Sequence, residues 1–130
     1  MPAYESQPYD NLIAGYVVPL ANVSVIVKSG SGVIKRGTVL GVVSQLPETN
    51  ASHGMYIVAT VDSSKTDDPQ TPFAILSDQE VDATTKDVRA TGYVSGEFNR
   101  NALIFGGTDK VEKHEVAMRN IGLITKRVVE

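Results

Sequence analysis

The fold of this chain is indicated first by residues 38–43, which read TVLGVV. The run is rich in β-branched residues and almost continuously apolar, a pattern typical of a strand that is covered on both faces. We therefore expect these residues to lie at the centre of a β-sheet.

Further strand-like segments lie on both sides of this run. Apolar and polar residues alternate from Asn22 to Lys28, which predicts a half-buried strand. The turn residues 29–32, SGSG, then predict a hairpin to a return strand at Val33 and Ile34. Downstream, strands are predicted at residues 55–61, 73–76, 90–98 with a bend at Ser95-Gly96, 102–105 and 123–129, and residues 78–87 are predicted to be a polar connection.

One helix is predicted near the C-terminus, over residues 110–121. Asp109 is the candidate N-cap, with Glu112 three residues later as in a capping box, and Gly122 suits the left-handed position that ends a helix. With the strands, this predicts a mainly β fold: a compact β-barrel or β-tulip-like single domain, residues 15–130, with one short C-terminal helix. Residues 1–14 lack any periodicity and are predicted to form an extended N-terminal arm outside the core.

The bulk composition excludes several classes of function. The chain has 130 residues, 12 Lys and Arg against 15 Asp and Glu, and a net charge of -3 with the basic residues scattered. We therefore expect no direct contact with nucleic acid. There is no cysteine, so disulfides and thiol chemistry are excluded. The sequence carries no signal peptide or membrane-spanning pattern, and we expect synthesis in a cytoplasm without contact to a membrane.

The residues that usually perform catalysis are sparse and form no motif. The two histidines, His53 in a loop and His114 on the predicted helix, have no partner at a spacing that would bring ligands or a catalytic pair together, and we expect both on the solvated surface. Residues 92–96, GYVSG, do not match the G-x-S-x-G elbow of hydrolases. We predict no catalytic residue, no metal site and no cofactor.

The order of segments in the second half resembles a known family. These segments are PFAILSD at residues 72–78, VDAT at 81–84, YVSGEFN at 93–99 and ALIFGG at 102–107, with weaker likeness at 36–41 and 118–123. Their order and spacing resemble the head decoration proteins of tailed bacteriophages related to that of lambda. The resemblance covers about residues 15–126, and no single segment is specific by itself.

The resemblance implies a cement protein of the phage head. Members of such a family bind the outer surface of the expanded capsid as homotrimers at local threefold positions and stabilise it against the pressure of packaged DNA. The implied partner is the major capsid protein, and the implied location is the virion, after synthesis in the host bacterial cytoplasm. The N-terminal arm is implied to order against the capsid, and we expect its larger or stiffer groups to make the contact: Pro2, Tyr4, Pro8, Tyr9, Leu12 and Ile13.

An alternative from a different class is a β-barrel that binds a small molecule or a glycan. Such a domain would need a sizeable apolar pocket with a few convergent polar groups. The sequence has five Tyr, three Phe and no Trp, and these do not form an aromatic cluster. A hydrolase is a third possibility, disfavoured because no nucleophile is paired with a base.

Overall fold

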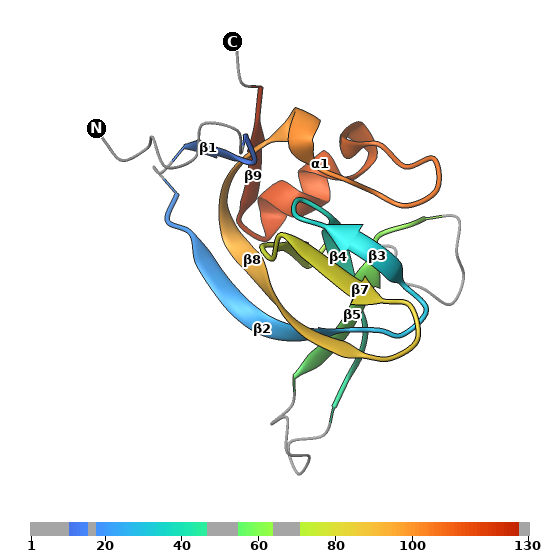
Figure 1. Cartoon of the computed structure of the whole chain (residues 1–130). Helices are drawn as coiled ribbons and strands as arrows, with labels where there is room; N and C mark the ends of the chain where they lie inside the picture. Colours follow the sequence, from blue (N-terminus) through green and yellow to red (C-terminus); the bar gives the residue numbers. More distant parts are fainter. Residues whose placement is uncertain (1–10, 16–17, 47–54, 64–70, 128–130) are drawn as a thin grey trace.

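The computed structural model describes residues 11–15, 18–46, 55–63 and 71–127. Most of the described chain is β-strand (Figure 1). A short 3₁₀ turn, Arg100–Ala102, follows the longest strand. In chain order the other elements are β1 Ile13–Gly15, β2 Ala21–Val27, β3 Gly32–Lys35, β4 Val39–Gln45, β5 Tyr56–Thr60, β6 Ala74–Leu76, β7 Glu80–Ala83, β8 Val88–Asn99, α1 Val111–Asn120 and β9 Leu123–Lys126.

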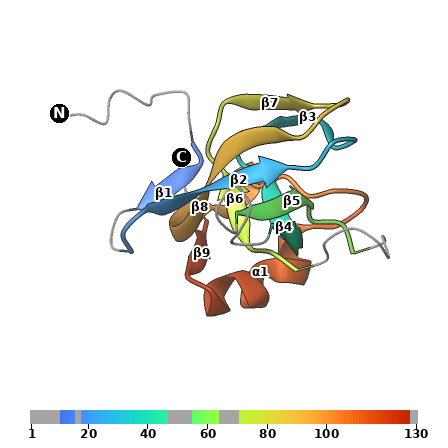
Figure 2. The same cartoon turned by 90° about the horizontal axis from the view of Figure 1, so that it is seen from below.

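The centre of the molecule is a β-barrel. In the part of the chain that the structure describes, strands pair in the order β8-β2-β5-β4-β6, and β6 pairs again with β8 to close a ring of five strands. The pairs are antiparallel except β2 with β5, which run parallel. A separate two-stranded ribbon, β3 with β7, lies on one side of the barrel and α1 on the other (Figure 2). The predicted fold class is confirmed.

Strand β8 belongs to two parts of the molecule. Its first half pairs with β2 and β6, and its last residues pair with β1 and β9. Opposite β2, the register shifts between Ala21, which faces Ser95, and Asn22, which faces Tyr93, so the strand carries a bulge there. Gly96 follows with φ +145°, a conformation that other residues rarely adopt. The bend predicted at Ser95-Gly96 is confirmed.

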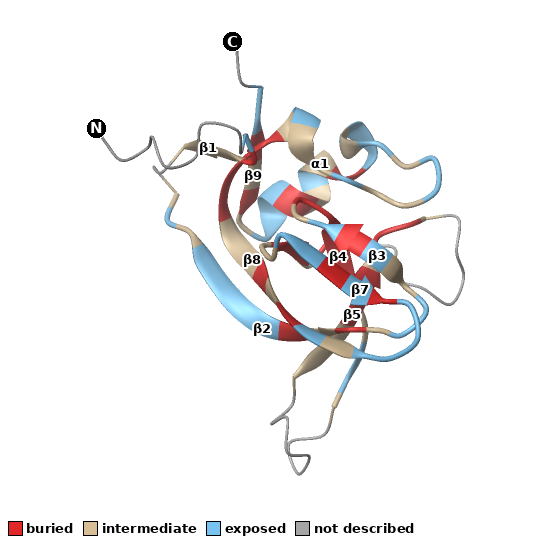
Figure 3. Ribbon diagram, in the orientation of Figure 1, coloured by how far each residue is buried: buried red, intermediate tan, exposed pale blue. Residues whose placement is uncertain are grey.

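The hydrophobic core has two clusters. We call the first the barrel cluster; its buried members are Val25, Val27, Ile34, Leu40, Val58, Leu76, Val81, Ala83 and Ala90. We call the second the helix-side cluster; its buried members are Leu12, Val39, Val61, Ile75, Phe98, Met118 and Leu123. In β4 the consecutive residues Val39 and Leu40 are both fully buried and belong to different clusters. The prediction that residues 38–43 form a central strand covered on both faces is therefore confirmed at its first half (Figure 3).

The predicted hairpin around residues 29–32 is wrong. Strand β2 pairs with β8 and β5, whereas β3 pairs with β7. Gly30 and Gly32 both have positive φ and turn the chain out of the barrel. The ribbon is held by Ile34 and Val81, which face the barrel cluster. Residues 80–83, which were predicted to belong to a polar connection, form strand β7 because they pair with β3.

Two further local predictions are corrected near the helix. Residues 102–105 form no strand; after the 3₁₀ turn only one isolated bridge joins Ile104 to Thr38. The predicted helix is present, but α1 starts one residue later than predicted, at Val111, and its N-cap is Lys110, without a side-chain hydrogen bond. Asp109 does not cap the helix because its carboxylate is already hydrogen-bonded to Ser63.

Candidate functional site

The N-terminal segment joins the folded domain at β1, and this junction is where the predicted contact residues meet the core. The backbone N–H of Asn99 donates to the carbonyl of Leu12 at 2.7 Å. Ile13 then faces Phe98, and Gly15 faces Glu97, in an antiparallel pairing with the end of β8. Leu12 is only 3% exposed and belongs to the helix-side cluster. The chain is therefore tied to the sheet from residue 12 onward.

This placement bears on the six residues expected to contact a capsid. Leu12 and Ile13 lie within the folded part, although the arm through residue 14 was expected to lie outside the core, because the Leu12 side chain is apolar and is buried in the helix-side cluster. Pro2, Tyr4, Pro8 and Tyr9 lie outside the described residues. Only two of the six residues can therefore be placed in the structure. The contact of all six with a capsid stays a prediction.

A buried carboxylate lies directly beneath β1. Glu97 is 1% exposed, and the backbone N–H of Val18 donates to its Oε2 at 2.5 Å. The ammonium of Lys126, on β9, lies 2.5 Å from Oε1. A Cβ on Gly15 would come within 2.5 Å of the same oxygen, so any larger residue there would have to displace the Glu97 carboxylate. A buried charge is tolerated only where such partners surround it.

Sequence reasoning missed Glu97 and Lys126 as residues of this junction. A signal was present, because Glu97 is a charged residue next to Phe98 within a predicted strand. A charge in that position is expected to be either exposed or paired. Whether Glu97 is exposed or paired depends on the position of β9. The sequence does not reveal that β9 pairs in parallel with β8.

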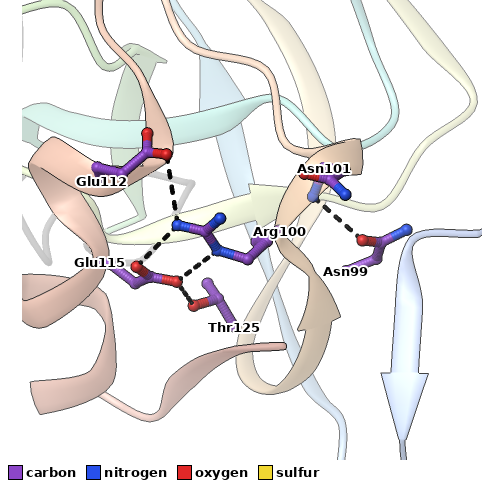
Figure 4. Close-up of polar contacts among 6 residues, drawn as sticks. All are labelled: Asn99, Arg100, Asn101, Glu112, Glu115 and Thr125. Atoms are coloured by element: carbon purple, nitrogen blue, oxygen red, sulfur yellow. Dashed lines mark hydrogen bonds and ion pairs between the residues drawn. The ribbon is translucent and has the colours of Figure 1, made fainter. Parts of the chain in front are cut away.

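A second group of charges fixes α1 against the end of β8 (Figure 4). Arg100 donates from Nε and Nη2 to the two carboxylate oxygens of Glu115, at 3.0 and 3.1 Å. Glu112 lies 3.6 Å from the same guanidinium, and the hydroxyl of Thr125 also donates to Glu115. The hydrogen bonds from Arg100 and then Thr125 lower the pKa of Glu115 below its ordinary value. Side chains from the 3₁₀ turn, α1 and β9 are thereby linked.

Ser63, His114 and Asp109 form a third polar group, whose order differs from that of a catalytic triad. Ser63 donates to Asp109 from its backbone N–H at 2.8 Å and from its hydroxyl at 2.7 Å. His114 Nε2 lies 2.8 Å from the same carboxylate. In a catalytic triad the imidazole stands between the hydroxyl and the carboxylate and accepts the hydroxyl proton. Here the carboxylate is in the middle, so this contact pattern does not activate Ser63 as a nucleophile.

The partners of Asp109 change its acidity. Burial raises the pKa of Asp109, but hydrogen bonds from His114 and Ser63 outweigh burial and lower it to about 2. The His114 ring also stacks on Phe105, with ring centroids 5.2 Å apart. The expectation that His114 is a solvated surface residue is wrong, because it lies on the same helix face as buried Met118. His53 lies outside the described residues.

The remaining features of the described chain offer no other obvious ligand site. The barrel interior is filled by fully buried side chains, among them Val25, Val27, Leu40 and Val58, as expected because a ring of five strands is too narrow for a ligand. One hollow of about 440 Å³ beside Arg100 and Lys110 is wide open to solvent. Within residues 11–15, 18–46, 55–63 and 71–127, no three metal-ligating side chains gather. None of the helices in these ranges is both long and apolar enough to span a membrane.

The fold and the junction at β1 define a class of protein: a small β-barrel domain whose leading segment is tied to one end of its longest strand, β8. Comparison with family models matches residues 4–122 to the bacteriophage lambda head decoration protein D family, and the chain belongs to that family. The resemblance noted in the sequence is thereby confirmed, and the match includes part of the leading segment. A comparison with curated proteins finds no match. Family membership gives the chain a role in decorating the phage head, on the capsid of the virion.

Proposed function

We propose that this chain is a cement protein that binds the outer surface of the expanded capsid as a homotrimer at local threefold positions. It contacts the major capsid protein through the segment that precedes Leu12 and stabilises the shell against the internal pressure of DNA. It does so by binding, without catalysis. The observation that carries the proposal is membership of the head decoration family over residues 4–122.

The junction at β1 supports a role for the leading segment. Because Leu12 and Ile13 are held by the core and by β8, everything before them starts from a fixed point on the barrel. An extended segment can add main-chain hydrogen bonds to a strand edge of a partner with little demand on its own sequence. Ordering such a segment costs about 1–2 kcal/mol per residue, so a single arm binds weakly.

Formation of a trimer compensates for the weak binding of a single arm. Once one arm of a trimer is bound, the other two bind at a high effective concentration, which can raise the overall affinity about 10²–10⁴-fold without any new contact. A trimer that contacts neighbouring capsomers also opposes their separation. We therefore expect trimers to bind the capsid tightly and monomers to bind it weakly.

The test uses expanded capsids that lack a decoration protein. The full chain is expected to sediment with them, and a variant lacking residues 1–10 is expected to remain in the supernatant. The deletion stops before Leu12, so the melting temperature of the variant should match that of the full chain. Particles loaded with the full chain should also withstand heating better than bare particles.

A matched control changes an exposed apolar residue elsewhere. Val33→Ser on the β3–β7 ribbon removes a side chain that is 52% exposed, and it should leave binding unchanged. Equal sedimentation of the full chain and the deletion variant would refute the role of the leading segment. Failure of the full chain to bind, with trimers absent in analytical ultracentrifugation, would refute the proposed function as a whole.

A further inference from the structure

We infer that Glu97 and Lys126 form a clamp that fixes the root of the leading segment to the barrel. The clamp is a property of the isolated chain. Its use, to carry tension from the segment into the barrel, rests on the proposed function. The two residues act as positioning residues: they hold the segment in place, and the contact itself is made by other residues.

Three separate parts of the chain converge on Glu97. It pairs across the sheet with Gly15 of β1, accepts the backbone N–H of Val18, and is ion-paired with Lys126 of β9. Gly15 is the last residue of β1, and Val18 lies in the connection from β1 to β2. One carboxylate therefore ties the end of β1 and part of this connection to β9.

The side chains of Glu97 and Lys126 differ in solvent exposure, and this difference makes the clamp testable. The Glu97 side chain is 1% exposed, whereas that of Lys126 is 48% exposed. Removing the lysine leaves a buried carboxylate without its ammonium partner, which is strongly unfavourable. Removing the carboxylate instead leaves a lysine that can turn to water at little cost. Loss of Lys126 should therefore be more harmful than loss of the Glu97 charge.

The position of the clamp suits the transmission of tension from the leading segment into the barrel. Glu97 lies on β8, the strand that is shared between the barrel and β1. Its neighbours Phe98 and Asn99 hold Ile13 and Leu12 by cross-strand pairing and by the Asn99 N–H to Leu12 hydrogen bond. Tension applied before residue 12 passes into β8 through these contacts, and the clamp keeps β1 in register with β8 while it does so.

Amide hydrogen exchange of the full chain tests the clamp directly. The N–H groups of Val18 and Asn99 report on it, because one donates to Glu97 and the other to Leu12. In Lys126→Met these two amides should exchange at least about tenfold faster than in the unmodified chain, since local opening becomes easier. In Glu97→Gln, which keeps an oxygen acceptor for Val18, the acceleration should be smaller.

The double variant Glu97→Gln/Lys126→Met sharpens the test. Without a buried charge left unpaired, its exchange should be slower than that of Lys126→Met and close to that of Glu97→Gln. Lys86→Met, an exposed lysine beside the opposite end of β8, is the matched control and should change neither amide. Unchanged exchange of Val18 and Asn99 in Lys126→Met, or equal acceleration by the control, would overturn the clamp.

Particle binding separates the clamp from the proposed function. If the unmodified chain binds particles, Lys126→Met should dissociate from them several-fold faster, while Lys86→Met should not. Faster exchange with an unchanged dissociation rate would overturn the role in carrying tension, while the clamp itself would be confirmed. If the unmodified chain does not bind at all, the proposed function fails, and the exchange data still decide whether the clamp exists.

Discussion

The two ends of the barrel are stabilised in different ways. The barrel cluster is built from aliphatic residues such as Val25, Val27 and Leu40. At the other end, the apolar residues Phe98, Leu123 and Met118 are accompanied by buried polar side chains from β8, β9 and α1. These polar residues are Glu97, Asn99, Thr125 and His114. Burial of apolar area stabilises the first end without directional contacts, whereas the second end is stable only if every buried polar group keeps its partner. The difference predicts where substitutions act through volume and where they act through lost partners.

The largest expected effect comes from Phe98→Ala, which removes the biggest side chain of the helix-side cluster. Phe98 is fully buried, so its loss should lower the free energy of unfolding by about 3–5 kcal/mol in denaturant titrations. Leu103→Ala should cost less, because Leu103 is only partly buried against the same cluster. Val116→Ala, at a helix position that is 73% exposed, is the control and should change stability by less than about 0.5 kcal/mol. A loss as small as the control's would mean that the helix-side cluster is not a packed core.

A smaller effect is expected for Gly96→Ala, at the point where β8 leaves the barrel. An added Cβ would lie 2.6 Å from the Leu20 side chain and 3.0 Å from the Phe98 ring, at a φ of +145°. Strain and overpacking together should cost about 2–4 kcal/mol, measured as a lower midpoint of unfolding. Gly30→Ala separates the two causes, because Gly30 has φ +89° but open space around its Cβ. It should cost only about 1 kcal/mol; equal losses at both sites would show that the close packing at Gly96 does not matter.

The smallest effect concerns pH and the buried carboxylate of Asp109. Its pKa of about 2 in the folded chain lies below the ordinary value of 3.8. Its contribution to stability is therefore fully present above about pH 4 and is lost as the pH falls toward 2. Asp109→Asn should lower the free energy of unfolding by about 1 kcal/mol at neutral pH, allowing for solvent screening. The difference from the unmodified chain should shrink between about pH 4 and pH 2.

A control for this pH dependence is Asp78→Asn, in the turn that joins β6 to β7. Denaturant unfolding of the three proteins at pH 7, 4, 3 and 2 gives the comparison. A constant difference between Asp109→Asn and the unmodified chain over that range would show that the charge of Asp109 does not stabilise the fold.

Much of the fold could be predicted from the sequence because alternation and apolar runs report local burial. This held for the central strand at residues 38–43, the bend at Ser95-Gly96, and the helix that ends before Gly122. Strand partners could not be predicted, because pairing joins segments that are distant in sequence. The separation of β3 from β2 is the example, since a glycine-rich turn is compatible with a hairpin and also with a departure from the sheet.

The candidate site was less predictable than the fold, for a related reason. Leu12 and Ile13 were assigned to the arm because the segment around them has no periodicity, and only the pairing with β8 shows that they are held. His114 carried a usable signal, since it is spaced three residues after Val111 and four before Met118 and so shares their helix face. Its polar side chain alone predicts exposure, whereas this helical spacing predicts burial. The partner of His114, Asp109, is shown only by the structure.

The consecutive residues Val39 and Leu40 have a consequence for how the domain melts. Because each fills a different cluster, a slip of β4 by one position would turn each side chain to the opposite face and disrupt both clusters at once. Ile75 and Leu76 in the neighbouring strand β6 impose the same constraint. Intermediates in which one cluster persists while the other has dissolved are thereby suppressed, and calorimetry should record a single cooperative transition whose calorimetric and van't Hoff enthalpies agree.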